Sequence, residues 1–254
     1  MNMVHNKVIL ITGGNTGIGA ASAMLLAENG ANVIINHRDN ASSANKLAAE
    51  INKKTNRDDA AFAVKADVSD ESQVQSMIST ILKKYGKIDV IVNNAGLKSF
   101  PKNMNDLSWK EMQTQLDITL KGAYNVVKSV LPYMLKQKGG NIINVLSAYT
   151  IGMPPQKLIP YVTAKYALEG FSKSMAAEVG PSGIRVNMIS PGITKTGFTE
   201  HLPEKLIEII AAQTPLRRIA APEDIAKVIL FLASSNSAYL TGVNIPVCGG
   251  FASL

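Results

Sequence analysis

The sequence predicts a doubly wound α/β fold, in which helices cover both faces of one parallel sheet of about seven strands. Two observations lead to this prediction. Short runs of aliphatic and β-branched residues alternate along the chain with longer stretches of helical periodicity. A glycine-rich segment directly follows the first of these runs, where such folds commonly bind ligands. We therefore expect functional residues to cluster just after the strands.

The first predicted strand covers residues 8–11, and its all-apolar sequence indicates burial on both faces. A glycine-rich loop follows it, and residues 17–28 then carry apolar side chains at helical spacing. In this arrangement Gly13 allows the turn, Gly17 lets the backbone approach a pyrophosphate, and Gly19 lets helix and sheet pack closely. Because three glycines after a strand can also form a simple turn, this interpretation depends on the residues downstream.

Further apolar runs continue the pattern, and helical stretches separate them. No internal repeat, low-complexity tract or linker rich in proline, serine or glycine divides the chain. We therefore expect a single domain over residues 1–254. The further runs cover residues 33–35, 61–64, 88–92, 141–146, 184–189 and 243–247.

Composition and charge narrow the function classes. The formal net charge is +7, but the basic residues are scattered and no aromatic-basic tract accompanies them, which argues against a nucleic-acid partner. His5, His37 and His201 lie far apart without cysteine or carboxylate at ligand spacing, so we expect no metal site. Cys248 is the only cysteine, and neither a signal peptide nor an apolar segment of about 20 residues is seen. We expect a cytoplasmic protein without a membrane partner, whose cofactor or substrate is anionic.

Several short motifs follow one another in a fixed order. They are Thr12-Gly-Gly-Asn-Thr-Gly-Ile-Gly19, Asp67-Val68, Asn93-Asn-Ala-Gly96, Ser147, Tyr161-Val-Thr-Ala-Lys165, Pro191-Gly192, Thr196, Leu240-Thr-Gly242 and Gly249-Gly250. Each motif alone is common, but the ordered set resembles the short-chain dehydrogenase/reductase family over nearly the whole chain. The resemblance implies a Rossmann-type NAD(P)-dependent oxidoreductase, commonly a homotetramer, with a substrate-covering segment around residues 193–219.

The resemblance also implies the site residues. Ser147, Tyr161 and Lys165 match the family's catalytic residues, and Thr119 stands where an asparagine usually completes a tetrad. No metal is implied. The implied cofactor-binding residues are Gly13, Asn15, Thr16, Gly17, Ile18, Gly19, His37, Arg38, Asp67, Val68, Asn94, Ala95, Gly96, Tyr161, Lys165, Pro191, Gly192, Ile193 and Thr196.

The chemistry of the first three residues can also be argued directly. Tyr161 and Lys165 are four residues apart at the start of a helical stretch, so both project from one face. An ammonium and a cationic nicotinamide ring nearby would favour the phenolate of Tyr161, whose free pKa is about 10. Tyr161 would then protonate a carbonyl during its reduction, while Lys165 would lower the pKa of Tyr161 and hold the nicotinamide ribose. Ser147 follows a predicted strand and would hydrogen-bond the substrate oxygen.

The cofactor depends on the end of the second predicted strand. A carboxylate about twenty residues beyond the glycine loop would indicate NAD, but this chain has Asn36-His37-Arg38 there. His37 stands where NAD-preferring family members carry aspartate. The planar guanidinium of Arg38 suits the 2′-phosphate of NADP, so NADP(H) is favoured. NAD(H) is the alternative, because Asp39 could turn inward and Arg38 could be a solvated loop residue.

The replacement of the tetrad asparagine by Thr119 leaves a second function open. Asn125 cannot substitute, because six residues along a helix place it about 240° around the axis. The alternative to an enzyme is therefore a non-catalytic NADP-binding sensor or scaffold. The presence of Ser147, Tyr161 and Lys165 together favours the enzyme.

The substrate is predicted only as a class, a carbonyl interconverted with a secondary alcohol. Among family members, 3-oxoacyl reductases that act on acyl carrier protein are the most similar subgroup, so a carrier-bound acyl group is one form of the expected substrate. Lys138 matches one basic carrier-binding position of that subgroup, whereas Ala177 stands where arginine is common. The substrate-covering segment is apolar, with Phe198, His201, Leu202, Leu206 and Ile210.

A homotetramer is expected from a surplus of apolar side chains on the helices. Residues 109–135 form one predicted helix with more apolar surface than a single core-facing stripe needs, and the next helix adds more. Such helices could pair across a two-fold axis. The apolar residues are Leu116, Leu120, Val127, Val130, Leu131, Phe171 and Met175.

Overall fold

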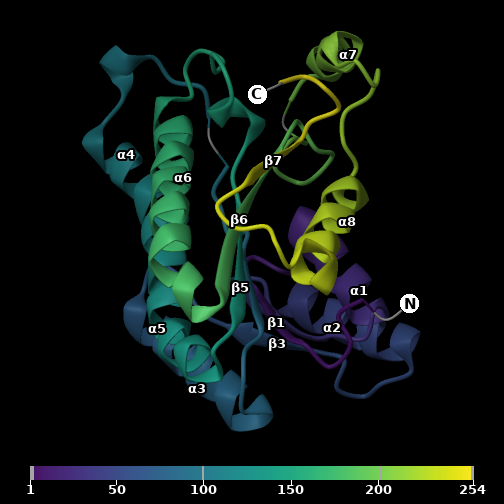
Figure 1. The fold of residues 1–254 in the computed structure, drawn as a ribbon. Coiled ribbons are helices and arrows are strands. Elements are labelled where there is room, and N and C mark those ends of the chain that lie inside the picture. Colours follow the sequence, from purple (N-terminus) through teal and green to yellow (C-terminus); the bar gives the residue numbers. More distant parts are fainter. Residues whose placement is uncertain (1–2, 99, 201, 253–254) are drawn as a thin grey trace.

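A computed structural model describes residues 3–98, 100–200 and 202–252 of the chain. Its centre is a seven-stranded sheet in the order β3-β2-β1-β4-β5-β6-β7, with every neighbouring pair parallel (Figure 1). The predicted fold class is thus confirmed. The strands are β1 (Val8–Ile11), β2 (Asn32–His37), β3 (Ala61–Lys65), β4 (Val90–Asn93), β5 (Gly140–Val145), β6 (Ile184–Pro191) and β7 (Asn244–Val247).

Helices cover both faces of the sheet, and each face has its own hydrophobic core. Ile9 and Ile11 of β1 pack into the core under α1, α2 and α8, whereas Val8 and Leu10 pack into the core under α3, α5 and α6. This alternation follows from the two-residue period of a strand. The α-helices are α1 (Gly17–Glu28), α2 (Ala41–Thr55), α3 (Glu71–Tyr85), α4 (Trp109–Leu116), α5 (Gly122–Gln137), α6 (Ile159–Val179), α7 (Glu204–Gln213) and α8 (Pro222–Ala233).

Local capping explains where two of the helices begin. Asp70 precedes α3, and its carboxylate accepts hydrogen bonds from the backbone N–H groups of Ser72 and Gln73. Ser108 and Glu111 form a reciprocal capping box at the start of α4. Short 3₁₀ turns occur at Met104–Asp106, Ala148–Thr150, Gly180–Ser182 and Ser235–Ser237.

The predicted long helix over residues 109–135 is interrupted in the structure. A π-helical segment, η2 (Asp117–Lys121), separates α4 from α5. Segments of this kind are rare and occur frequently at functional sites. Thr119 lies inside η2 and is buried there.

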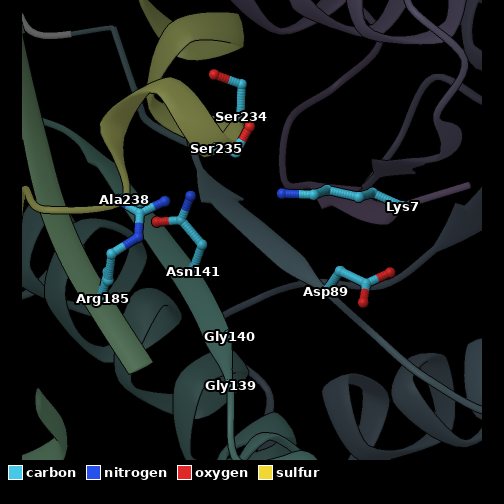
Figure 2. A pocket seen from close by; sticks show the side chains of 9 residues that line it. All are labelled: Lys7, Asp89, Gly139, Gly140, Asn141, Arg185, Ser234, Ser235 and Ala238. Carbon is cyan, nitrogen blue, oxygen red and sulfur yellow. The ribbon is translucent and has the colours of Figure 1, made fainter. Parts of the chain in front are cut away.

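The amino edge of the sheet holds a polar cavity of about 240 Å³ (Figure 2). It is lined by residues of β5 and β6, by Lys7 and Asp89 directly before β1 and β4, and by the segment after α8. The Nζ atom of Lys7 donates to the carbonyl oxygen of Ala233 at 2.7 Å. Asn141 and Arg185 both donate to the carbonyl oxygen of Leu232, at 2.6 and 3.0 Å. Because the last carbonyls of a helix have no helical partner, these donors complete the C-terminus of α8. We interpret this cluster as structural.

No helix in the described part of the chain is both long enough and apolar enough to cross a bilayer.

Candidate active site

The segments selected from the sequence meet at the opposite, carboxyl edge of the sheet. Each follows the end of a strand, and parallel strands all end at the same edge. The glycine loop follows β1, His37 ends β2, and Asp67 and Val68 follow β3. The segment from Asn94 to Gly96 follows β4, Ser147 follows β5, and the segment from Gly192 to Thr196 follows β6.

Hydrogen bonds tie the glycine loop to the loop after β4. The hydroxyl of Thr12 accepts from the backbone N–H groups of Asn94 and Ala95, both at 3.0 Å. In return, the side-chain amide of Asn94 donates to the carbonyl oxygens of Thr12 and Gly13, both at 3.0 Å. β1 and β4 are neighbours in the centre of the sheet, although their following connections run in opposite directions. These bonds therefore span the switch point at which doubly wound sheets bind ligands.

The glycine loop has the shape and the free donors that a dinucleotide pyrophosphate needs. Gly13 and Gly17 adopt φ values of +58° and +52°, which other residues rarely adopt. A Cβ atom on Gly19 would collide with the carbonyl oxygen of Gly13, so only glycine lets α1 start this close to the loop. No side chain caps the first turn of α1, and that turn has no acidic residue. Its N–H groups thus fit an anionic group.

Thr196 and Phe198 cover this loop region from the segment after β6. A Cβ atom on Gly17 would lie 3.0 Å from the Cγ2 atom of Thr196, and one on Gly96 would lie 3.7 Å from the ring of Phe198. Beyond them α7 lies within the stretch of residues 193–219 that the sequence analysis expected to cover the substrate. His201, which the sequence analysis included in this segment, lies outside the described residues.

The end of β2 carries the residues expected to choose the cofactor. His37 is buried, and its Nδ1 atom has no hydrogen-bond partner. Burial, followed by the charge of Lys65, lowers the pKa of His37, which favours the neutral imidazole. Arg38 and Asp39 are exposed and form an ion pair of 2.7 Å through Nε. Within the described residues no hydrogen bond uses the two terminal nitrogens of Arg38.

Asp67 and Val68 lie in a braced turn after β3. The carboxylate of Asp67 accepts from the N–H and the hydroxyl of Ser69, at 2.9 and 2.7 Å. The side-chain amide of Asn125 donates to the carbonyl oxygen of Val68 at 2.9 Å. Asn125 therefore supports this turn from α5, which agrees with the prediction from helix geometry that it cannot replace the tetrad asparagine.

Ser147, Tyr161 and Lys165 come together beside the end of β5. Tyr161 lies in the first turn of α6, and the Nζ atom of Lys165 lies 5.8 Å from the centre of its ring. This Nζ atom also donates to the carbonyl oxygen of Val145 at 2.7 Å. Ser147 is buried, and its Oγ atom accepts from the N–H of Tyr149 at 3.2 Å.

The pKa values show what the protein does to these groups by itself. Burial raises the pKa of Tyr161, and a hydrogen bond with Ser147 partly offsets this rise. Burial also lowers the pKa of Lys165 to about 8. The sequence analysis expected a lowered pKa for Tyr161 from two cations, Lys165 and the nicotinamide ring. With the protein's own groups alone, burial outweighs that effect.

Three residues that the sequence analysis gave no role in the site contribute to its structure. Thr12 holds the β4 loop, and the carbonyl oxygen of Asn36 accepts from the N–H of Gly14 at 2.9 Å. Gln115 is a buried amide on α4, one helical turn before Thr119. Thr12 and Asn36 stand at strand ends, which was an available signal. Gln115 gave no signal, because a glutamine between polar residues of a helix is ordinarily exposed.

The chain belongs to the short-chain dehydrogenase/reductase family. Residues 13–252 match a sequence family described as enoyl-(acyl carrier protein) reductase. A 3-oxoacyl-(acyl carrier protein) reductase of Thermotoga maritima is 38% identical over 252 residues, which cover 97% of this chain and 98% of that protein. The oxidoreductase UcpA of Salmonella typhimurium is 37% identical, and the aligned residues cover 98% of this chain and 96% of UcpA.

Solved structures agree with this assignment. The crystal structure of a 3-ketoacyl-(acyl carrier protein) reductase from Brucella melitensis, complexed with NADH, has a TM-score of 0.90 and 31% sequence identity. The aligned residues cover 98% of this chain and 100% of the chain from Brucella melitensis. The protein is thus an oxidoreductase that acts on carbonyl or alcohol groups with a nicotinamide dinucleotide. Among the described residues no three histidine, cysteine, aspartate or glutamate side chains are grouped to hold a metal ion.

The lowered pKa of Lys165 predicts the pH dependence of the reaction. The ammonium form of Lys165 is lost as the pH rises through about 8. Since kcat/KM reports the free enzyme, we expect kcat/KM for the reduced cofactor to be highest below pH 8 and to fall above it, by up to about tenfold per pH unit. Steady-state rates at saturating carbonyl substrate from pH 6 to 10 measure this. A profile that stays level to pH 10 would contradict the role of the Lys165 charge.

Proposed function

We propose that this protein is a ketone reductase of the 3-oxoacyl type that prefers NADP(H), with NAD(H) as the alternative cofactor. The observation that carries this proposal is the convergence of Ser147, Tyr161 and Lys165 at the same edge of the sheet as the uncapped N-terminus of α1. The relatives from Thermotoga maritima and Brucella melitensis, both named as reductases of 3-oxoacyl or 3-ketoacyl groups on acyl carrier protein, support the substrate class.

In this proposal each catalytic residue has one task. The bound cofactor supplies a hydride to the carbonyl carbon. Ser147 donates a hydrogen bond to the carbonyl oxygen and so fixes the carbonyl group near Tyr161. Tyr161 transfers its phenolic proton to the same oxygen as negative charge develops there, and a secondary alcohol results. The ammonium of Lys165 stabilises the phenolate that this transfer leaves behind.

The preference for NADP(H) rests on the charges around the end of β2. The terminal nitrogens of Arg38 are free within the described residues, and Lys65 pairs with His37 in the β2–β3 register. No carboxylate ends β2, so nothing there replaces the acceptor that binds the 2′-hydroxyl of NAD. Two cations near one position favour a phosphate over a hydroxyl. The ion pair of Arg38 with Asp39 weakens this preference, which is why NAD(H) stays the alternative.

The carrier of the acyl group is the less constrained part of the proposal. Lys138 and Ala177 are both exposed, so one of the two basic positions for an acidic acyl carrier protein is kept. A cavity of about 320 Å³ lies next to the segment after β6. Apolar side chains such as Ile193, Ile210 and Phe251 form most of its lining, to which Arg218 and Asp224 also contribute. Its lining suits the chain of an acyl thioester, and we place the reaction in the cytoplasm, where Cys248 would stay reduced.

The proposed assembly is a homotetramer built on α5 and α6. Val127 and Val130, which the sequence analysis counted as surplus apolar surface, are instead buried in this chain's own core. The large apolar side chains exposed on these helices are Tyr124, Tyr133, Leu135, Ile159 and Tyr166. They offer a contact surface that two copies of this chain could share across a two-fold axis.

A carbonyl panel tests the proposed reaction. We expect oxidation of NADPH with a 3-oxoacyl thioester, on coenzyme A or on acyl carrier protein, and Tyr161→Phe should lower kcat by about 10²- to 10⁴-fold because the acid is lost. NADPH binding should change little, and Tyr166→Phe on the same helix is the matched control. Binding of NADPH to the wild-type protein without oxidation by any carbonyl would instead indicate the non-catalytic sensor. Normal turnover in Tyr161→Phe would refute the assigned acid.

The cofactor preference can be tested at Arg38. The change Arg38→Asp replaces a phosphate partner by a repelling charge, so we expect KM for NADPH to rise by about 10- to 100-fold. NADH, measured in the same variant, is the internal control and should be affected far less. An unchanged ratio of the two KM values would show that Arg38 does not select the cofactor.

The assembly can be tested by light scattering at micromolar concentration. We expect the mass of four chains for the wild-type protein. Tyr124→Glu combined with Tyr166→Glu should reduce that mass, because two buried carboxylates would be left without partners at the interface. A monomeric wild-type protein would contradict the proposed tetramer.

A further inference from the structure

A chain of hydrogen bonds runs through the core between the sheet and α6. The Nδ2 atom of Asn93 on β4 donates to the Oδ1 atom of Asn144 on β5 at 2.8 Å. The Nδ2 atom of Asn144 donates to the hydroxyl of Ser172 on α6 at 2.7 Å, and this hydroxyl donates to the carbonyl oxygen of Leu168 at 2.6 Å. Asn144 and Ser172 are fully buried, and Asn93 is 5% exposed. Polar side chains thus connect two strands with the catalytic helix inside an otherwise apolar core.

The strand register explains why the two amides meet. Asn93 and Asn144 are partners in the parallel pairing of β4 with β5. Ile91 and Ile142, each two residues earlier, both pack in the core under α3, α5 and α6. Because side chains two residues apart in a strand point to the same face, both amides are directed into this core. Asn144 can therefore reach Ser172 on the overlying helix.

These hydrogen bonds are directional, whereas the apolar contacts around them are not. An apolar side chain at either position could fill the same space in several arrangements of the helix. A buried amide or hydroxyl that loses its partner is costly, so Asn144 and Ser172 favour the one arrangement in which they meet. α6 cannot slide along β5 or rotate without breaking the bond between them.

The same strand and the same helix face carry catalytic residues. Lys165 precedes Ser172 by two helical turns, so both side chains project from one face and lie about 10 Å apart along the axis. The Nζ atom of Lys165 donates to the carbonyl oxygen of Val145 at 2.7 Å, and Val145 directly follows Asn144. Hydrogen bonds therefore attach α6 to β5 at two points. Ser147 follows the end of the same strand.

We propose that Asn144 and Ser172 are positioning residues that hold α6 at the height and rotation that the catalytic residues require. This inference rests on the proposed reductase function. The hydrogen bond between the two side chains fixes Tyr161 and Lys165 on α6 relative to Ser147 after β5. Neither positioning residue takes part in the transfer of the hydride or of the proton.

Asn93 extends this positioning to the loop after β4. It directly precedes the segment from Asn94 to Gly96, which we expect to border the cofactor. Its side chain holds the same amide of Asn144 that binds Ser172. One hydrogen-bonded chain thus sets the cofactor loop and the catalytic helix relative to each other.

Ser172→Ala tests the proposal, because it removes the hydroxyl with little change in volume. We expect kcat to fall about tenfold, with KM for NADPH unchanged, because the catalytic residues on α6 are misplaced while the cofactor loop keeps its position. Ser22→Ala is the matched control. Ser22 is also fully buried in a helix, and its hydroxyl likewise donates to a carbonyl oxygen four residues earlier, that of Ile18. Within the described residues this hydroxyl makes no hydrogen bond to another element.

The pKa of Lys165 separates positioning from a general loss of stability. Burial lowers this pKa to about 8, so a displaced α6 that admits water to the ammonium should raise it. We expect a higher pKa of Lys165 in Ser172→Ala and an unchanged one in Ser22→Ala. The pH dependence of Lys165 acetylation, followed by mass spectrometry on the folded protein without substrate, measures it.

A double-mutant cycle assigns the effect to the bond between the two side chains. Asn144→Leu should also lower kcat, and its combination with Ser172→Ala should add little, because both changes remove the same hydrogen bond. Effects that simply multiply would overturn the proposal. If Asn144→Leu does not fold, Ser172→Ala decides alone: an unchanged kcat or an unchanged pKa of Lys165 overturns the proposal. If the wild-type protein reduces no carbonyl but the pKa of Lys165 rises in Ser172→Ala, the proposed function fails while the positioning role stands.

Discussion

The hydrogen bonds between Thr12 and Asn94 are the constraint on which the candidate site depends. Their two loops leave neighbouring strands, β1 and β4, and then run to opposite sides of the sheet. The four hydrogen bonds of about 3.0 Å hold the loops together and thereby fix the start of α1, where the pyrophosphate is expected. The glycines give the loop after β1 its shape, and the side chains of Thr12 and Asn94 fix its position.

Burial sets the direction of the pKa shifts of the catalytic residues Tyr161 and Lys165. Both Tyr161 and Lys165 are shifted toward their neutral forms, the tyrosine by a raised pKa and the lysine by a lowered one. A neutral tyrosine retains the proton that carbonyl reduction requires, whereas alcohol oxidation requires the phenolate. The protein's own groups thus prepare the site for reduction, and a bound cation would be needed to favour the reverse direction.

Much of the fold followed from the sequence because its signals are local. Apolar runs such as residues 8–11 and the glycines after them reflect burial and backbone geometry at the positions where they occur. The missed features depend on contacts between distant segments. The π-helical segment around Thr119 interrupts a helix whose apolar spacing looked continuous, and Val127 was counted as surface because its partners lie on other elements. Gln115 could not be identified either, since its burial follows from the packing of α4 against α6.

The hydrogen bond between Lys7 and the end of α8, at the amino edge of the sheet, has a consequence for the folding of the protein during its synthesis. Lys7, directly before β1, donates to the carbonyl oxygen of Ala233 at the end of α8, and these residues are 226 positions apart. β1 is an interior strand of the sheet, and α8 packs closely against α1. During synthesis β1 therefore leaves the ribosome long before α8, the helix with which it shares a hydrophobic core. One apolar face of this strand, formed by Ile9 and Ile11, therefore lacks its partners from α8 until that helix has been made, so the core on this face of the sheet can close only late in synthesis.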